Sequence, residues 1–172
     1  MKDMQLLIEP LIPSLRRFAR SVLRDRSLAD DLVQDCLEHA VGRWRQRRSD
    51  GDVRAWVFAI LHNLILNHLR KTRRRGRDVA IEDVDEAQFG RAPTQEDALR
   101  HRDLLQALDE LPEEQRSVLL LVSVEDLSYA ETAKALDIPV GTVMSRLNRA
   151  REKVFRAVEG EAQESTHLRV VK

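Results

Sequence analysis

The segment 128–152 restricts the possible fold more than any other stretch of the chain. Ser128-Tyr-Ala-Glu131 is a capping box, in which the serine and glutamate side chains bond to free backbone N–H groups at the start of a helix. A short helix to Leu136, a turn at Asp137–Pro139 and a second helix from Val140 follow. Two helices joined by a turn of three or four residues are typical of a helix-turn-helix, so the segment predicts this motif.

Five further segments place apolar residues at helical spacing, so an all-α fold is predicted for the whole chain. Only six Gly and five Pro occur in 172 residues, and the runs of β-branched or aromatic residues that mark strands are absent. The predicted helices cover residues 5–23, 27–41, 53–71, 95–109 and 113–123. We expect a capping box at Ser27–Asp30 to begin the second of them, and the helix from Val140 to end near Val158.

The helices are predicted to form two small domains joined by a flexible acidic linker. Residues 1–75 hold three predicted helices, which suffice for a small domain. Residues 76–95 combine Gly, Pro and many acids with little periodicity, and such a linker spans roughly 65 Å when fully extended. The second domain is expected over residues 96–160, followed by a frayed tail over residues 161–172.

The formal net charge is zero, yet the charges are segregated along the chain. Residues 43–77 carry eleven Lys and Arg against two acids, and residues 140–158 carry five against one. Acid-rich stretches at 78–97 and 98–139 separate the two basic blocks. This segregation predicts a protein that binds a polyanion through two separate surfaces.

The second helix of the predicted helix-turn-helix carries side chains that suit contact with DNA. Ala133 on the first helix is small enough for close packing against Val143 and Leu147, which leaves the polar and basic residues free. Arg can recognise guanine and Asn can recognise adenine through paired hydrogen bonds. A basic helix face alone could equally be an ordinary solvated surface. The candidate DNA contacts are Thr142, Ser145, Arg146, Asn148, Arg149, Arg151 and Lys153.

Several functional classes lack support in the sequence. His62 and His68 stand six residues apart, not the four of a helical zinc site, and no P-loop or dinucleotide-binding glycine motif occurs. Cys36 is the single cysteine, which excludes an internal disulfide and a cysteine-rich metal site. No apolar run approaches the roughly 20 residues of a membrane helix, and the N-terminus does not resemble a signal peptide. We therefore expect a cytoplasmic, non-enzymatic protein without cofactor, metal or membrane insertion.

Motifs in both halves of the chain share their order and spacing with one known family. The motifs are ADDLVQD (29–35), WVFAILHN (56–63), LPEEQR (111–116), SYAETA (128–133) and PVGTVMSRLNRAR (139–151). The first resembles region 2.2, the second, followed by Arg70, resembles region 2.4, and the last three resemble region 4 of the extracytoplasmic-function (group IV) sigma factors of the sigma-70 superfamily. The resemblance implies a transcription initiation factor in which the second domain recognises the −35 promoter element.

The resemblance also implies the partners of the chain. In that family the region 2.2 helix docks on the β′ clamp helices of core RNA polymerase, and region 4 docks on the β flap. An anti-sigma factor commonly wedges between the two domains. We therefore expect core RNA polymerase, promoter DNA and an anti-sigma factor as partners. The residues that match the polymerase-binding face are Asp31, Gln34, Asp35 and Glu38.

For the −10 element, the resemblance points to the loop before the Trp56 helix and to the basic end of that helix. In the family this loop traps a base flipped out of the duplex, and the two acids here suit the amino group of cytosine or adenine. The matching residues are Ser49, Asp50, Gly51, Asp52, Val53, Asn63, Arg70, Lys71, Arg73 and Arg74. Trp56 itself is expected in the core. Two departures, Asn67 where the family often has Asp and Met144 where many members have Arg, put the details of DNA recognition in doubt.

Two alternatives from other classes remain open at this point. A helix-turn-helix regulator that binds DNA without polymerase would share the C-terminal half but not the match in residues 29–63. An adaptor that mimics a sigma factor would lack the arginine-rich recognition helix. Binding of duplex DNA in the absence of polymerase distinguishes the regulator from the sigma factor.

Overall fold

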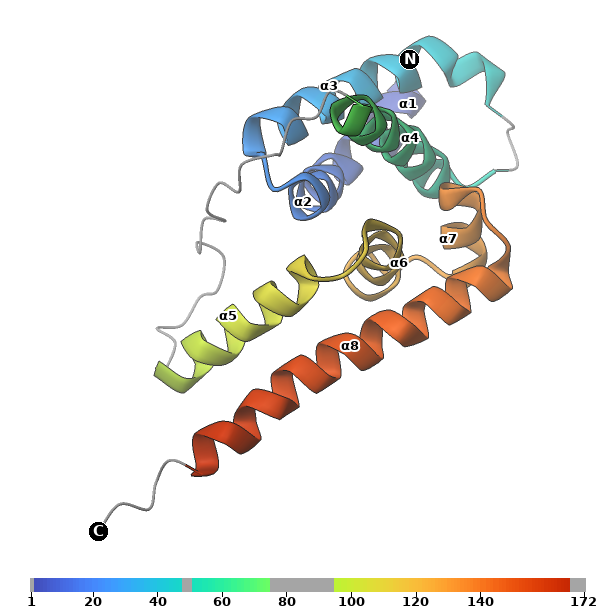
Figure 1. Ribbon diagram of the computed structural model, residues 1–172. Helices are drawn as coiled ribbons and strands as arrows, with labels where there is room; N and C mark the ends of the chain where they lie inside the picture. Colours follow the sequence, from blue (N-terminus) through green and yellow to red (C-terminus); the bar gives the residue numbers. More distant parts are fainter. Residues whose placement is uncertain (1, 48–50, 75–94, 168–172) are drawn as a thin grey trace.

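The computed structural model describes residues 2–47, 51–74 and 95–167, with side chains over residues 4–47, 51–74 and 102–157, and all regular structure in this part is helical (Figure 1). The elements are α1 Lys2–Ile8, η1 Glu9–Leu11, α2 Ile12–Leu23, α3 Arg26–Arg43, η2 Trp44–Gln46, α4 Val53–Arg74, α5 Gln95–Asp109, α6 Glu113–Ser123, α7 Tyr129–Leu136 and α8 Val140–His167. The predicted all-α fold is therefore confirmed. Most of the predicted linker, together with Ser49 and Asp50, lies outside the described residues.

The predicted helix over residues 5–23 is divided into three short elements. The 3-10 turn η1 contains Pro10, which has no backbone N–H and cannot continue an α-helical hydrogen-bond ladder. Helix α2 then begins at Ile12 and tolerates Pro13, because the first turn of a helix needs no N–H donor. The proline positions therefore determine where α1 ends and α2 begins.

The predicted capping box at Ser27–Asp30 is wrong. Asp25 caps α3 instead, since its carboxylate accepts the Leu28 N–H at 2.9 Å. Arg24 ends α2 in a left-handed conformation with φ 57°, so the chain reverses early and Ser27 already lies inside α3. The carboxylate oxygens of Asp30 both accept from Arg20 at 2.9 Å, which ties α3 to α2.

Helices α2, α3 and α4 enclose the core of the N-terminal half. Phe18, Leu61 and Ile65 are almost wholly buried. The rings of Phe18 and Phe58 meet edge to face at 5.6 Å, a favoured geometry for an aromatic pair. Because Phe58, Leu61 and Ile65 are spaced by three and four residues, they share one side of α4.

Helices α5 to α8 form the C-terminal half, and α5, α6 and α7 have their predicted bounds. The buried guanidinium of Arg116 donates to the carbonyls of Leu108 at 2.8 Å and Asp109 at 2.6 Å, closing the end of α5 where helical carbonyls lack partners. Helix α8 continues to His167, past the predicted end at Val158, because residues 159–167 are rich in the helix formers Glu, Ala and Gln.

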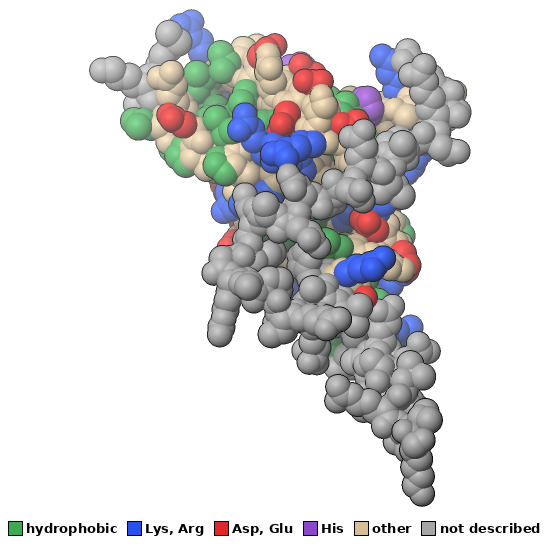
Figure 2. All heavy atoms as spheres, turned by 90° about the vertical axis from the view of Figure 1, so that its left-hand side faces the viewer, with side chains coloured by type: hydrophobic (Ala, Val, Ile, Leu, Met, Phe, Trp, Pro, Cys, Tyr) green, Lys and Arg blue, Asp and Glu red, His purple; other side chains and the backbone are tan. Residues whose placement is uncertain are grey.

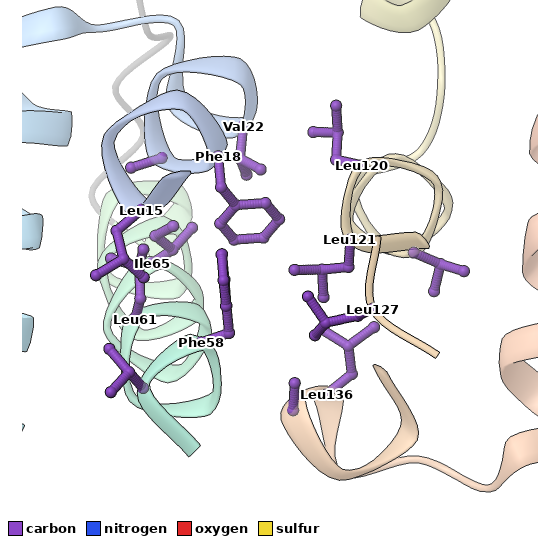
Figure 3. Packing of buried hydrophobic residues seen from close by; sticks show 14 of the residues in the cluster. Leu15, Phe18, Val22, Phe58, Leu61, Ile65, Leu120, Leu121, Leu127 and Leu136 are labelled. Atoms are coloured by element: carbon purple, nitrogen blue, oxygen red, sulfur yellow. The ribbon is translucent and has the colours of Figure 1, made fainter. Parts of the chain in front are cut away.

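The two halves pack against each other and share one hydrophobic cluster. Helix α7 lies against α4, and α6 lies against α2. Phe18 and Phe58 of the N-terminal half point toward Leu121 and Leu127 of the C-terminal half (Figure 3). Helices α5 and α8 run beside each other away from this contact (Figure 1).

The described surface on the side shown in Figure 2 is mixed in charge. Blue Lys and Arg side chains lie next to red Asp and Glu side chains on the N-terminal half, beside a green hydrophobic area. This side is therefore not a uniformly basic face, and the predicted nucleic-acid contacts have to be placed helix by helix.

Candidate nucleic-acid interface

Helices α7 and α8 form the predicted helix-turn-helix. The Ser128 hydroxyl accepts the Glu131 N–H at 3.2 Å and the Glu131 carboxylate accepts the Ser128 N–H at 2.7 Å, which confirms the capping box. Helix α7 is followed by the C-cap residue Asp137, which has φ 53° and donates its N–H to the Ala133 carbonyl. Because α8 begins only three residues later, at Val140, the short turn fixes the two helices relative to each other.

The predicted −35 residues lie on the outer part of α8, where each is exposed or half-buried. Val143, Leu147 and Ala150 face the core and are buried. By helical spacing, five of the candidates share one side of the helix, namely Thr142, Ser145, Arg146, Arg149 and Lys153. Asn148 and Arg151 are exposed farther round the helix. The structure thus gathers most of the predicted set into one stripe, the recognition stripe.

Two cations of the recognition stripe are held by the domain itself. The Arg146 guanidinium lies 2.7 Å from the Glu114 carboxylate, and the Lys153 ammonium donates to the Glu110 carbonyl at 2.6 Å. Arg149 is exposed between them. Met144, the residue that departs from the family pattern, is 53% exposed on the same helix. A thioether at this position can contact a base only through apolar packing.

The predicted −10 residues are spread along α4 and are not brought to one point. Gly51, Asp52 and Val53 lie at its start, Asn63 is exposed near its middle, and the basic residues lie at its end. With a rise of 1.5 Å per residue, the two ends of this 22-residue helix are about 30 Å apart. The basic residues Arg70, Lys71, Arg73 and Arg74 are all exposed.

The described end of the predicted −10 loop is held by backbone contacts. The Asp52 carboxylate accepts the Arg54 N–H at 2.7 Å, and the Asp52 carbonyl accepts the Trp56 N–H at 3.1 Å. The Gly51 carbonyl accepts from the Arg47 guanidinium at 2.9 Å. Asp52 thus serves as a helix cap, the usual role of an aspartate at this position.

Asp52 also contacts the helix-turn-helix. A hydrogen bond with the Glu131 side chain raises the pKa of Asp52, and the same bond, together with the bonds to Ser128, lowers the pKa of Glu131 to about 2. Two neighbouring carboxyl groups disfavour the ionised form of one of them, here Asp52. The predicted −10 loop and the helix-turn-helix therefore lie against each other in this structure.

The predicted polymerase-binding residues share one exposed face of α3. Asp31, Gln34, Asp35 and Glu38 are all exposed and follow helical spacing, and Gln34 donates to Glu38 at 3.1 Å. The opposite side of α3 is buried in the core, including Cys36, whose pKa burial raises to about 12. Cys36 is therefore a core residue.

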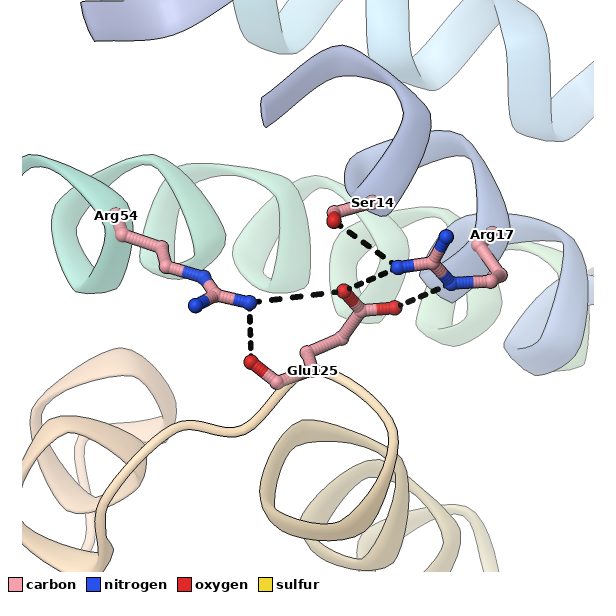
Figure 4. A network of polar contacts seen from close by, with 4 residues as sticks. All are labelled: Ser14, Arg17, Arg54 and Glu125. Atoms are coloured by element: carbon pink, nitrogen blue, oxygen red, sulfur yellow. Dashed lines mark hydrogen bonds and ion pairs between the residues drawn. The ribbon is translucent and has the colours of Figure 1, made fainter. Parts of the chain in front are cut away.

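A buried acid that no sequence motif indicates lies between the two halves. Glu125 is 1% exposed, and its carboxylate accepts from the Arg17 guanidinium at 3.0 and 2.9 Å (Figure 4). Arg54 donates to the Glu125 carbonyl and lies 3.9 Å from its carboxylate. The available signal was a lone glutamate within the apolar stretch 118–127.

His62 shows how close the two candidate DNA surfaces are. Its side chain is buried, and burial, with added repulsion from Arg146 and Arg70, lowers its pKa to about 4. His62 precedes the −10 candidate Asn63 on α4, whereas Arg146 belongs to the recognition stripe on α8. Residues expected to bind separate promoter elements therefore lie near each other.

No group of three or more His, Cys, Asp or Glu side chains in the described residues is placed to hold a metal ion. Within the same residues, no helix has both the length and the hydropathy that crossing a bilayer requires.

Comparison with known proteins identifies both halves. Residues 8–62 match the Sigma2 domain of PhyR, and residues 101–154 match sigma-70 region 4. The ECF RNA polymerase sigma factor EcfG of Rhodopseudomonas palustris is 38% identical over 83% of this chain and 78% of its own length. The ECF RNA polymerase sigma factor SigC of Mycobacterium tuberculosis is 31% identical over 80% of this chain and 74% of its own.

A solved structure supports the same relationship across almost the whole chain. The sigma factor RpoE of Bartonella quintana, crystallised in complex with the anti-sigma factor NepR, superposes with a TM-score of 0.80. The two chains are 29% identical, and the match covers 92% of this chain and 98% of the other. With sigma domains in both halves, in the predicted order, the chain belongs to the extracytoplasmic-function RNA polymerase sigma factors, a non-enzymatic family whose members bind RNA polymerase.

Proposed function

We propose that this sigma factor contacts a promoter at two places, through α4 at the −10 element and through the recognition stripe of α8 at the −35 element. In this assignment residues 1–75 are region 2 and residues 96–160 are region 4. The observation that carries the proposal is the gathering of five predicted DNA contacts on one side of α8, at the second helix of a helix-turn-helix.

Within the recognition stripe, Arg149 is the residue best placed to contact a base. It is exposed, and its guanidinium can donate two hydrogen bonds to a guanine edge in the major groove. Thr142 and Ser145 suit phosphate contacts, which position the helix without specifying sequence. Asn148 and Arg151 lie outside the stripe and are assigned to the flanking backbone.

The test compares Arg149 of the recognition stripe with an exposed arginine outside both proposed DNA surfaces. Arg149→Ala in polymerase holoenzyme should weaken binding to a cognate promoter roughly 5- to 100-fold, as expected for the loss of a paired base contact. Arg16→Ala is the control, because Arg16 is an exposed arginine on α2, outside both proposed DNA surfaces, and lies 3.8 Å from the Asp30 carboxylate. Equal losses of promoter affinity for both variants, in a fluorescence anisotropy titration at constant salt, would contradict the assignment of the recognition stripe to the −35 element.

For polymerase, we propose that the acidic face of α3 docks on the β′ clamp helices and that region 4 docks on the β flap. A charged face speeds association with a partner of opposite charge, and reversing the sign of one of its charges lowers the association rate more than neutralising it. Asp35→Lys should lower the association rate with core polymerase at least about tenfold. Glu9→Lys, an exposed acid outside the α3 face, should leave that rate within about twofold. Similar association rates for the two variants would exclude the α3 face as the docking surface for core polymerase.

We further propose that an anti-sigma factor regulates this protein in the cytoplasm. The support is the Bartonella quintana relative, which forms a complex with the anti-sigma factor NepR. A pull-down with the full chain from the cytoplasmic fraction of its own bacterium tests the proposal. A co-purifying protein that blocks core binding supports it, and recovery of polymerase subunits alone contradicts it.

A further inference from the structure

Glu125 has an environment that only the contact between the two halves explains. It lies in the connection between α6 and α7, where its N–H donates to the Leu120 carbonyl and the next residue, Asp126, has φ 50°. Its carboxylate is 1% exposed. Burying a carboxylate is unfavourable unless cations or donors compensate for the lost water.

The cations that compensate Glu125 both come from the other half of the molecule. Arg17 on α2 makes two hydrogen bonds to the carboxylate, and Arg54 on α4 lies 3.9 Å from it and also donates to its carbonyl (Figure 4). Ser14 accepts from Arg17 at 3.0 Å and orients it. Among the described residues, the C-terminal half supplies no cation to this carboxylate.

Further contacts of the same kind join the halves at other points. Arg24 at the end of α2 lies 2.8 Å from the Asp109 carboxylate of α5, and Arg73 of α4 lies 3.2 Å from the Glu113 carboxylate of α6. The apolar contact around Phe58 belongs to the same interface (Figure 3). The interface therefore combines a buried core with charges of opposite sign on the two sides.

This closed arrangement is incompatible with the two DNA contacts of the proposed function. The −10 and −35 elements differ by about 25 base pairs in position, or roughly 85 Å at 3.4 Å per base pair. In the closed form, Arg146 of the recognition stripe is near enough to lower the pKa of His62 on α4. Arg73 of the proposed −10 surface is also paired with Glu113 of the C-terminal half. The halves must separate before both elements are bound.

We propose that the closed arrangement is an autoinhibited resting state of the free protein and that Glu125, held by Arg17 and Arg54, is its latch. The proposal rests on the proposed function for the claim that the active state is open. Opening exposes the Glu125 carboxylate to water and frees Asp52, Arg54 and Arg73 beside the −10 surface. Since polymerase selects the open form, its apparent affinity is reduced by the fraction of protein that is open.

Arg17→Gln is the variant that tests the latch. It leaves the Glu125 carboxylate buried with its remaining cation at 3.9 Å, which favours opening to water. Arg17 is itself 46% exposed and belongs to neither DNA surface nor the α3 face. Arg16→Gln is the matched control, because Arg16 is the neighbouring arginine on α2 and pairs with Asp30 inside the N-terminal half.

Two measurements are made on the full chain, and circular dichroism verifies that each variant retains its helices. In small-angle X-ray scattering the wild type and Arg16→Gln should give one compact distance distribution, whereas Arg17→Gln should give a larger radius of gyration with a second maximum. In titrations with core polymerase, Arg17→Gln should bind about tenfold more tightly than Arg16→Gln.

Three outcomes would overturn the latch. The first is equal scattering and equal polymerase affinity for the two variants. The second is wild-type scattering that already shows two separated domains. The third is an Arg17→Gln chain that opens without any gain in affinity for core polymerase. The wild-type scattering needs no substitution, so it decides the closed state even if Arg17→Gln fails to fold. Absence of core binding by the wild type would contradict the proposed function instead.

Discussion

Three buried side chains that can carry charge are accommodated in three different ways. The Glu125 carboxylate is paired with two arginines of the other half. His62 is neutral, because burial lowers its pKa to about 4. Cys36 is also neutral, because burial raises its pKa to about 12, and its thiol donates to the Val57 carbonyl at 3.5 Å. The environments of His62 and Cys36 each lead to a prediction that can be tested on the protein in solution.

His62 should make the protein less stable in mild acid. Its pKa falls from 6.5 in an unfolded chain to about 4 in the folded one, so its contribution is fully present above pH 6.5 and is lost as the pH falls toward 4. The full shift corresponds to about 3 kcal/mol. Urea unfolding of wild type and His62→Leu between pH 7.5 and 4.5 tests this. The wild type should lose more free energy of unfolding than the variant over that range, and parallel pH profiles would contradict the assignment.

Cys36 should be unreactive in the native protein. A thiol with a pKa of about 12 carries almost no thiolate at neutral pH, and its burial also blocks access of reagents. Modification by a disulfide reagent should be at least about a thousandfold slower than in urea. Ser21→Cys, which adds a thiol at an exposed position of α2, supplies a fast-reacting control. Equal rates for the two thiols in native buffer would contradict the burial of Cys36.

At the scale of elements, local signals determine where most helices begin and end. The Ser128–Glu131 capping box begins α7, Pro10 interrupts the first predicted helix, and Asp25 caps α3. The sequence also contains the apolar periodicity and the helix-turn-helix, so the fold class and the recognition stripe are predictable from it. The competition between Asp25 and Ser27 for the cap of α3 is not, because the left-handed Arg24 decides it.

Removing the α7 capping box should destabilise the helix-turn-helix by a modest amount. In Ser128→Ala the Glu131 N–H loses its acceptor, which costs about 1 kcal/mol of free energy of unfolding. Ser21→Ala, an exposed substitution inside α2, should change stability by less than about 0.5 kcal/mol. Chemical denaturation of both variants measures the difference, and indistinguishable midpoints would show that the cap contributes nothing.

At the scale of the whole molecule, the segregated charges also form ion pairs between the two halves of the protein. Arg54 and Arg73 of the basic block 43–77 meet Glu125 and Glu113 of the acidic stretch 98–139. Charge segregation alone is as consistent with a polyanion partner as with ion pairs inside the protein. Helical periodicity identifies the apolar face of each helix but does not determine which faces pack together. The sequence therefore predicted two domains but not the contact between them.

Phe58 should be the most sensitive apolar residue of that contact. It is fully buried, touches Phe18 edge to face, and points toward the C-terminal half (Figure 3). Phe58→Ala should cost about 3–5 kcal/mol of free energy of unfolding. Phe155→Ala is the control, since Phe155 is 61% exposed and should lose less than about 1 kcal/mol. Similar losses for the two variants in thermal or urea unfolding would contradict the placement of Phe58.

The most direct test of the whole account is run-off transcription by core RNA polymerase with the purified chain, on a library of promoters that includes the one upstream of its own gene. The account predicts discrete transcripts that require both core polymerase and this chain, and that disappear with Arg146→Ala and Arg149→Ala combined. Tight binding of the chain to duplex DNA in the absence of polymerase, with no binding to core polymerase, would contradict it.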